Sequence, residues 1–192
     1  MLRHKHFRLV WFAAFGSSIG TWMEGVGVQW LMAKLTLAPE WVAAGRPDAA
    51  LMMGFLGAAQ LGPTLLLGIV GGLTADRVNR RTLLMVTQMI MMCVAITLLV
   101  CSLAGVLSPF LLLSISLLNG IATAFNIPAW QVLTPRLVPR EELTRAIVLN
   151  GIQFNLARVI GPGLGGLLMA KYSPDVLFAV NAVSFIGVVL AV

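Results

Sequence analysis

The sequence predicts an all-α membrane protein whose six helices cross the bilayer in alternating directions, and three observations support this fold class. Apolar residues make up 59% of the 192 residues, charged residues only 10%, and the mean hydropathy is +0.94. A soluble domain carries about a quarter charged residues, so this chain has too little polar surface to fold in water. Its apolar residues form runs of about 20, the length that a helix needs to cross a bilayer. They do not alternate with polar residues, as they would in transmembrane strands.

Six apolar segments follow one another, each separated from the next by charged residues, proline or both. They cover residues 9–35, 49–73, 83–107, 110–130, 147–170 and 176–192. The short connections predict antiparallel neighbours. The sixth segment reaches residue 192 without a polar flank, and a helix that ended there would leave carbonyl groups unsatisfied in lipid. We therefore expect residues 1–192 to be one unit, the N-terminal half of a longer chain, with a homodimer of six-helix chains as the alternative.

The basic residues predict which side of the membrane each connection faces. With the N-terminus in the cytoplasm, Lys34, Arg46 and Lys171 face outside and Arg158 lies within the fifth segment. All other basic residues then face inside: Arg3, Lys5, Arg8, Arg77, Arg80, Arg81, Arg136, Arg140 and Arg145. This distribution follows the positive-inside rule and predicts a multi-pass protein of the cell (inner) membrane. It argues against a nucleic-acid-binding surface, which needs its charges on one continuous face.

Glu24 lies in the middle of the first segment, and it is the one acidic residue at the centre of a predicted span. A charge there costs at least about 2.5–3.5 kcal/mol, so its position is informative. Glu24 continues a row of small residues, Gly16 and Gly20, that lets another helix approach closely. It is either a proton or cation site, because a low dielectric constant favours the neutral carboxyl group, or a packing carboxyl that is hydrogen-bonded to a neighbour.

The fourth segment carries a row of polar residues at spacings of three or four positions. These are Ser116, Asn119, Thr123 and Asn126. Such a row on one face of an apolar helix lines a water-filled cavity or makes hydrogen bonds to other helices, and both explanations fit.

The fifth segment contains Asn155 and Arg158, three positions apart and therefore on a shared face. Arg158 either forms a structural pair with a carboxylate or with carbonyl groups at a helix end, or it binds an anionic part of a substrate. The third and sixth segments are almost wholly apolar. We therefore expect these two to be peripheral and lipid-facing, and the first, fourth and fifth segments to be interior.

The connection between the second and third segments carries a charged motif. Residues 71–81 read Gly-Gly-Leu-Thr-Ala-Asp-Arg-Val-Asn-Arg-Arg. Asn79 suits a left-handed backbone position in a tight turn. The positive-inside rule explains the arginines but not Asp76 among them.

This connection resembles the signature of the major facilitator superfamily, Gly-x-Leu-Ala-Asp-Arg-x-Gly-Arg-Arg, which lies between helices two and three. The matching residues are Gly72, Ala75, Asp76, Arg77, Arg80 and Arg81. Thr74 replaces a leucine of the pattern and Asn79 its second glycine. In the family this connection latches the cytoplasmic side, with the aspartate facing a helix N-terminus of the other half, where a carboxylate is favourable.

A second resemblance lies in the fifth segment, where Gly161-Pro162-Gly163-Leu164-Gly165-Gly166 matches the Gly-Pro-x-x-Gly-Gly core of the family's antiporter motif. Proline interrupts the helical hydrogen bonds, and glycine permits close packing and bending. Ala157, Gly161 and Gly165 form a small-residue face suited to contact with another helix. The upstream glycines of the motif are replaced by Val148 and Ala157.

Two further stretches, from Gly20 to Met32 and from Pro128 to Arg145, are similar to the drug- and siderophore-exporting branch that includes enterobactin and macrolide exporters, and so are the segments 155–158 and 161–162 that follow. The resemblance implies a twelve-helix fold of two bundles, each made of inverted three-helix repeats, that alternates between inward-open and outward-open states. It implies a secondary transporter of a small molecule coupled to protons.

The sequence contains no constellation typical of a metal site, a catalytic nucleophile or a phosphate-binding loop, so we expect no cofactor, no metal and no enzyme activity. Export of a small amphipathic or siderophore-like compound is the first hypothesis, with Glu24 and the row on the fourth segment lining the path. An importer on the same scaffold and a membrane-embedded assembly protein are the alternatives.

Overall fold

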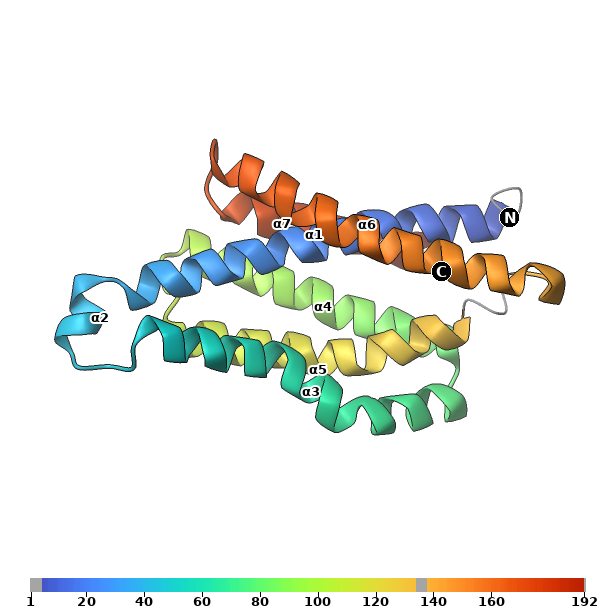
Figure 1. Cartoon of the computed structure of the whole chain (residues 1–192), viewed down its shortest axis with the longest axis horizontal. Helices are drawn as coiled ribbons and strands as arrows, with labels where there is room; N and C mark the ends of the chain where they lie inside the picture. The colour runs from blue at the N-terminus through green and yellow to red at the C-terminus, as the bar shows by residue number, and fades with distance from the viewer. Residues whose placement is uncertain (1–4, 134–137, 192) are drawn as a thin grey trace.

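The computed structural model of the chain describes residues 5–133 and 138–191, with the side chains of residues 5 and 6 excepted. Arg3, Arg136 and Val192, which figured in the predictions above, lie outside these ranges. The long helices of the described residues are α1 (Lys5–Thr36), α3 (Ala49–Arg77), α4 (Arg80–Leu103), α5 (Pro109–Leu133), α6 (Leu143–Met169) and α7 (Asp175–Ala191). They run side by side in alternating directions (Figure 1). The predicted all-α fold class is confirmed.

Two short elements interrupt the connections between the long helices. Helix α2 (Pro39–Ala43) lies between α1 and α3, and a 3-10 helix, η2 (Arg140–Glu142), precedes α6. The indole Nε1 of Trp41 on α2 donates to the carbonyl oxygen of Pro47 at 2.8 Å. This bond closes the connection on itself, and the buried Trp41 ring lies next to Phe110 of α5, with ring centroids 5.6 Å apart.

Helix α4 begins and ends earlier than its apolar run. It starts at Arg80, three residues before the predicted boundary, and ends at Leu103 rather than at residue 107. Gly105 adopts a φ of +66°, and the Val106 amide donates to the carbonyl of Cys101. A glycine in this left-handed conformation ends a helix by capping its last carbonyls, so apolar character alone placed the boundary too late.

Length and composition single out three described helices, α3, α4 and α5, as able to cross a membrane. Helix α7 is equally apolar but has 17 residues. Helices α1 and α6 are long enough, and they are the two that carry an ionisable residue at their centre, Glu24 and Arg158. Glu24 and Arg158, two of the candidate functional residues, are thus among the polar residues that lower the hydropathy of these two helices.

The bundle has a definite packing order. Helix α1 lies between α6 and α7, α7 packs on α4, α4 on α5, and α5 on α3. The core contains Met32, Leu56, Leu98, Leu112 and Phe178, each almost fully buried. Five long helices and α2 contribute to this cluster, at the end of the bundle where α2 lies (Figure 1).

The six long helices form two three-helix repeats, α1, α3 and α4 in the first and α5, α6 and α7 in the second, and the two repeats make equivalent contacts. Helix α1 packs on α6 and α7 in the way that α5 packs on α3 and α4. The equivalence extends to single residues. Gly71 of α3 lies against Ala124 and Phe125 of α5, and Gly165 of α6 lies against Met23 of α1. Gly165 is 94 positions after Gly71, and Phe125 is 102 positions after Met23. Because each repeat has three long helices, the second has the opposite orientation in the membrane, as in inverted-repeat transporters.

Within this bundle, two helices pack differently from the expected division into interior and peripheral segments. Helix α7, expected at the periphery, buries Phe178 and Phe185 between α1 and α4. Helix α6, expected in the interior, packs chiefly on α1 and leaves most of its surface exposed. Large apolar side chains fill the space between helices, so an apolar helix can be central, and a polar helix can lie at the edge of this bundle.

Candidate substrate and coupling sites

Glu24 is buried between α1 and α7. Its side chain is 4% exposed, and its Oε2 accepts a hydrogen bond of 2.6 Å from the Nδ2 of Asn181. The backbone of α7 comes this close because Gly20, one turn before Glu24, has no side chain: a methyl group there would lie 2.7 Å from the Oδ1 of Asn181. The carboxyl group is therefore held by a neutral amide and, within the described residues, by no cation.

Asn126, the last member of the polar row on α5, makes a similar pair. It is buried, and its Nδ2 donates to the Oγ1 of Thr87 on α4 at 2.9 Å. The Thr87 hydroxyl in turn donates to the carbonyl of Leu84 at 2.9 Å. This pair joins two helices across a buried contact, so of the two explanations of the polar row, hydrogen bonding between helices applies to Asn126.

The other members of the row occupy different surroundings. Ser116 is buried, whereas Asn119 and Thr123 are half-buried. The hydroxyl of Thr123 donates to the backbone carbonyl of Asn119 at 2.8 Å. The Oδ1 of Asn119 is buried and has no hydrogen-bond partner among the described residues. Asn119 is therefore the member of the row whose side-chain acceptor stays available.

The pairs Glu24–Asn181 and Asn126–Thr87 occupy equivalent places in the two repeats. Glu24 and Asn126 are 102 positions apart, and Thr87 and Asn181 are 94 apart, the same separations that relate the packing glycines and their contacts. A buried polar pair at this place is thus a property of both repeats. Only the first repeat uses a carboxyl group there.

Arg158 lies on the opposite side of α1 from Glu24. Its guanidinium stands over the ring of Trp22, 5.6 Å from the centroid, and the Trp22 ring meets Phe154 edge to face at 6.0 Å. Trp22 and Glu24 are two positions apart, which places them about 200° apart around a helix. The structure therefore does not bring the two ionisable groups together.

Asn155 is exposed next to Arg158 on α6. Its Nδ2 donates to the carbonyl of Gly151 at 2.8 Å, one turn earlier on the same helix. Arg158 is also exposed, and within the described residues its contact is the Trp22 ring rather than a carboxylate. Asn155 and Arg158 share a face of α6, as their spacing indicated, and that face is not covered by another described helix.

The charged connection forms the turn between α3 and α4. Asp76, Arg77 and Arg81 are exposed, and Arg80 is half-buried. The expectation for Asn79 is wrong: its φ is −63° and its ψ is 114°, and no described residue other than glycine has a positive φ. The Oδ1 of Asn79 instead accepts from the amides of Arg81 and Thr82, at 3.0 and 3.4 Å, and so caps α4.

The glycines of the two motifs divide into tight and open positions. A methyl group on Gly161 would lie 2.5 Å from the Cβ of Trp22, and one on Gly165 would lie 3.4 Å from the Cα of Met23. Gly72 and Gly166 have open space around them. Gly161 and Gly165 thus form the contact of α6 with α1, together with the buried Ala157.

Pro162 lies within α6 without ending the helix, half-buried beside this contact. Of the two neighbouring glycines on α3, Gly71 contacts α5, and Gly72, the glycine of the motif, does not. The sequence motif therefore marks the right stretch of α3 but not the packing residue. Small residues four positions apart on α5 mark its contacts with α3: Ala124 lies against Gly71, and Gly120 lies against the backbone of Ala59.

Four side chains of these sites were not among the candidates: Trp22, Thr87, Phe154 and Asn181. Asn181 is an isolated polar residue in an apolar helix, and that is the signal that could have singled it out. No sequence signal pairs Trp22 with Arg158, since the two belong to helices far apart in the chain.

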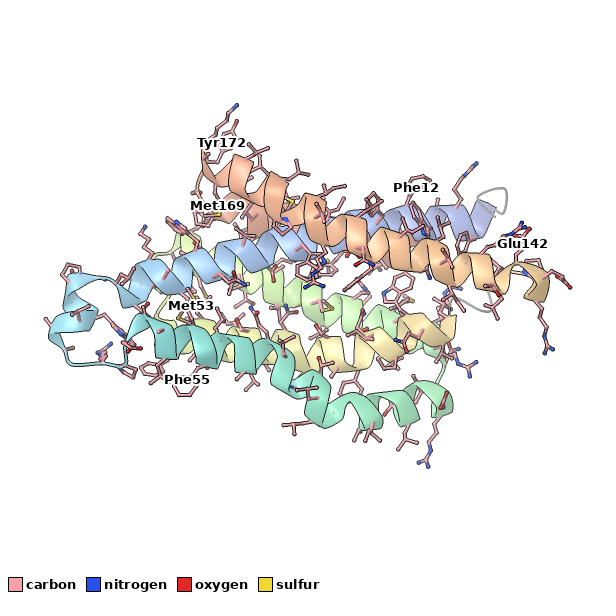
Figure 2. The ribbon with its side chains drawn as sticks, in the orientation of Figure 1. Phe12, Met53, Phe55, Glu142, Met169 and Tyr172 are labelled. Atoms are coloured by element: carbon pink, nitrogen blue, oxygen red, sulfur yellow. The ribbon has the colours of Figure 1, made fainter. Side chains whose placement is uncertain are left out.

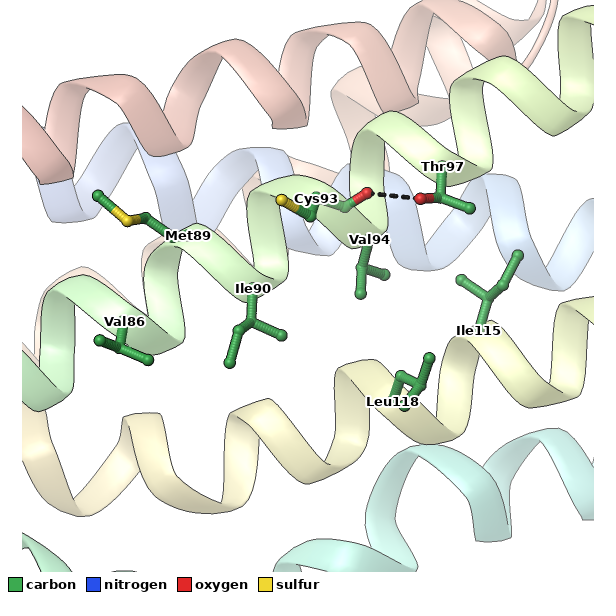
Figure 3. A pocket seen from close by; sticks show the side chains of 8 residues that line it. All are labelled: Val86, Met89, Ile90, Cys93, Val94, Thr97, Ile115 and Leu118. Carbon is green, nitrogen blue, oxygen red and sulfur yellow. Dashed lines mark hydrogen bonds between the residues drawn. The ribbon is translucent and has the colours of Figure 1, made fainter.

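A groove of about 410 Å³ opens between α4 and α5 on the outer surface of the bundle (Figure 3). Its wall is apolar apart from Cys93 and Thr97, and the Thr97 hydroxyl donates to the carbonyl of Cys93 at 2.8 Å. Because the Thr97 hydroxyl already donates within α4, the groove has no free hydroxyl donor to orient a ligand. Within the described ranges no group of three or more His, Cys, Asp and Glu residues could hold a metal ion.

The two ends of the bundle differ in charge. Glu142 marks the start of α6 and Tyr172 follows its end, at opposite ends of the molecule (Figure 2). The end with Glu142 also holds the start of α1 and the α3–α4 turn (Figure 1). Its basic residues with described side chains are Arg8, Arg77, Arg80, Arg81, Arg140 and Arg145, whereas Lys34, Arg46 and Lys171 belong to the other end.

Comparison with known proteins gives a family match over the whole chain. The model of the family described as transmembrane secretion effector matches residues 1–192. An uncharacterized MFS-type transporter, YfiS of Bacillus subtilis, is 30% identical over 170 residues, which are 88% of this chain and 37% of the relative.

Two further relatives have names that state a substrate. The staphyloferrin A transporter of Staphylococcus aureus is 27% identical over 90% of this chain and 41% of its own length. Macrolide efflux protein A of Streptococcus pyogenes is 28% identical over 74% of this chain and 33% of its own length. The chain thus spans at most about two fifths of the length of these relatives.

Proposed function

The chain belongs to the transmembrane secretion effector family of the major facilitator superfamily, and from this premise we propose that it is the N-terminal half of a proton-coupled exporter. The transported molecule is a small amphipathic or siderophore-like compound. Transport proceeds by alternating access, in which this six-helix bundle and a second one rock about a substrate site near the middle of the membrane. The chain therefore carries out no covalent chemistry.

One observation supports proton coupling above the others: Glu24 is a carboxyl group at a place where the other repeat has the amide Asn126. The fold needs a buried polar pair there, and an amide suffices for it. A carboxyl group adds the ability to bind and release a proton at membrane depth. Ionisable residues in that position form proton relays in transporters.

The arrangement of the rest of the chain fits alternating access. Asp76 is exposed at the α3–α4 turn, free to meet a positively polarised helix end of a second bundle. The tight contact of Gly161 with Trp22 fixes α6 to α1. The two repeats are thus packed on each other as one six-helix unit, and the motion occurs between bundles. The basic end of the bundle lies in the cytoplasm.

The substrate class and the direction of transport rest on the relatives. One relative is named for staphyloferrin A and another for macrolide efflux. The word efflux favours export. The name of the staphyloferrin A transporter does not state a direction, so uptake on the same scaffold is the second candidate.

The Glu24→Gln variant tests the coupling role in the full-length transporter. The probe is whichever of radiolabelled erythromycin and staphyloferrin A the wild-type protein transports. Glutamine keeps the shape of the side chain and a hydrogen bond to Asn181 but does not titrate, so we expect proton-driven efflux to be lost while membrane insertion is unchanged. The matched control is Asn126→Ser at the equivalent place in the other repeat, which keeps proton-driven transport. Wild-type efflux in the Glu24→Gln variant would contradict the proposal.

The direction of transport is measured separately, in inside-out vesicles that carry an imposed proton gradient, acidic inside. An exporter accumulates the probe inside such vesicles, because protons leave as the substrate enters. An importer does not accumulate it under this gradient. Accumulation that needs the reversed gradient would replace the export proposal by the uptake candidate.

A further inference from the structure

We propose that Arg158, Trp22 and Phe154 form a subsite that binds an organic anion with an aromatic or planar body. This inference rests on the proposed transport function, because it assigns the substrate class of the same path. It starts from the position of Arg158, an exposed guanidinium at the middle of a membrane-spanning helix.

The depth of Arg158 makes its charge informative. It is 15 residues after the start of α6 and 11 residues before its end, about 22 and 16 Å along the helix axis. Both distances exceed the reach of an arginine side chain, so Arg158 does not reach the lipid headgroups by extending along the helix. A charge at this depth faces the protein interior or a water-filled cavity.

The surface of α6 separates into two flanks on either side of its contact with α1. The contact of α6 with α1 follows a line through Ala157 and Gly161. With 3.6 residues per turn, Phe154 and Arg158 lie on one flank of this line, and Asn155 lies further round the helix on the same flank. The other flank is apolar and exposed: Leu156, Ile160 and Ile152. The apolar flank suits lipid, and the flank with Arg158 therefore faces the inside of the complete transporter.

The side chains around Arg158 form a preformed recognition surface. The guanidinium lies over the Trp22 ring, and Phe154 closes against the edge of that ring. Among the described residues, Glu24 is the only acidic one at membrane depth, and it is engaged with Asn181 on the other side of α1. The positive charge of Arg158 is thus not neutralised by a described residue. Arginine binds carboxylates through paired N–H donors, and a cation–π contact with Trp22 does not use these donors.

The repeat supplies a second, independent observation. By the separations of 94 and 102 positions, the counterparts of Arg158, Phe154 and Trp22 in the other repeat are Thr64, Gln60 and Ala124. At these three places, the equivalent contact of α3 with α5 therefore has neither a cation nor an aromatic ring. The cluster is an addition that packing does not require, which favours a role in binding.

Binding of a matched pair of probes, 1-naphthoate and the neutral 1-naphthamide, to the purified full-length transporter tests the subsite. Calorimetric titration should show that the wild-type protein prefers the anion. Arg158→Gln should weaken naphthoate binding about tenfold or more, the effect of losing a charged hydrogen-bond partner, and leave naphthamide binding unchanged. Arg158→Lys should retain part of the preference, because the charge remains but the planar fork is lost.

Two results would overturn the subsite: equal binding of both probes by the wild-type protein, or an undiminished preference for naphthoate in Arg158→Gln. Should the Arg158 variants fail to fold, Trp22→Leu and Phe154→Leu keep the charge and remove the aromatic wall. They should weaken both probes several-fold, and unchanged binding would reject the subsite. If the preference is absent while Glu24→Gln still loses efflux, only the subsite is wrong. If the preference is present but no transport is found, only the proposed function is wrong.

Discussion

Single glycines determine how closely the helices of this bundle approach. At Gly161 the backbone of α6 lies so near α1 that an added methyl group would be 2.5 Å from Trp22 Cβ and 3.0 Å from the carbonyl oxygen of Ile19. Both are parts of a rigid helix that cannot rotate away. The same closeness holds Trp22 beside Arg158, so the packing glycine also builds the proposed anion subsite.

Gly161→Ala should lower the free energy of unfolding by about 1–3 kcal/mol, the usual cost of overpacking a tight contact. The matched control is Gly163→Ala on the same helix, where nothing lies within 4 Å of the added methyl group. Alanine there should be neutral or stabilising by up to about 1 kcal/mol, because glycine is the weaker helix former. Denaturant unfolding of the purified protein in detergent measures both. Equal effects of the two substitutions would contradict the tight contact.

The sequence singled out Glu24 and Arg158 by their charge at membrane depth, but it could not name their partners. Asn181 is 157 positions from Glu24, and a contact over that distance depends on how the helices pack. Trp22 and Arg158 are likewise joined only by the fold. Residue type predicts that a buried polar group has a partner, whereas the identity of that partner follows from the three-dimensional structure.

Asn79 shows the same limit at the ends of helices. Its place in a short charged turn suggested a left-handed residue, because the family pattern has glycine there. In the structure its side chain caps α4 through Arg81 and Thr82. Asparagine and glycine are both good residues at a helix N-terminus, so the exchange is explained by capping.

Asn79→Ala should lower the free energy of unfolding by about 0.5–2 kcal/mol, the usual cost of losing a capping side chain. Asn79→Gly, which restores the family residue, should cost only a few tenths of a kcal/mol. Thermal unfolding of the two variants side by side compares them. A glycine variant as unstable as the alanine variant would show that the cap does not stabilise α4.

The lengths of the helices followed from the apolar runs, but their neighbours did not. Helix α7 was expected at the periphery because it is apolar, and it lies between α1 and α4. A lipid tail and a neighbouring helix are both apolar surroundings, so hydropathy does not distinguish them. The spacing of small residues was the better guide, since Ala157, Gly161 and Gly165 do mark the contact of α6 with α1.

At the scale of the whole molecule, an internal repeat organises both the fold and the candidate site. Equivalent glycines and equivalent buried polar pairs recur at constant separations. Where the repeats are alike, the residues support the fold. Where they differ, at Glu24 and at Arg158 with its aromatic neighbours, the residues are those for which we propose functions in transport.

The account depends most on one arrangement: six helices that cross the bilayer, with the basic end of the bundle in the cytoplasm. Single cysteines in a background without Cys93 and Cys101 measure it directly. Val78→Cys lies in the α3–α4 turn, and Ala44→Cys and Ser173→Cys lie at the opposite end of the bundle. With a membrane-impermeant thiol reagent on intact cells, Ala44→Cys and Ser173→Cys should react, and Val78→Cys should react only after permeabilisation. Reaction of Val78→Cys in intact cells would contradict the arrangement.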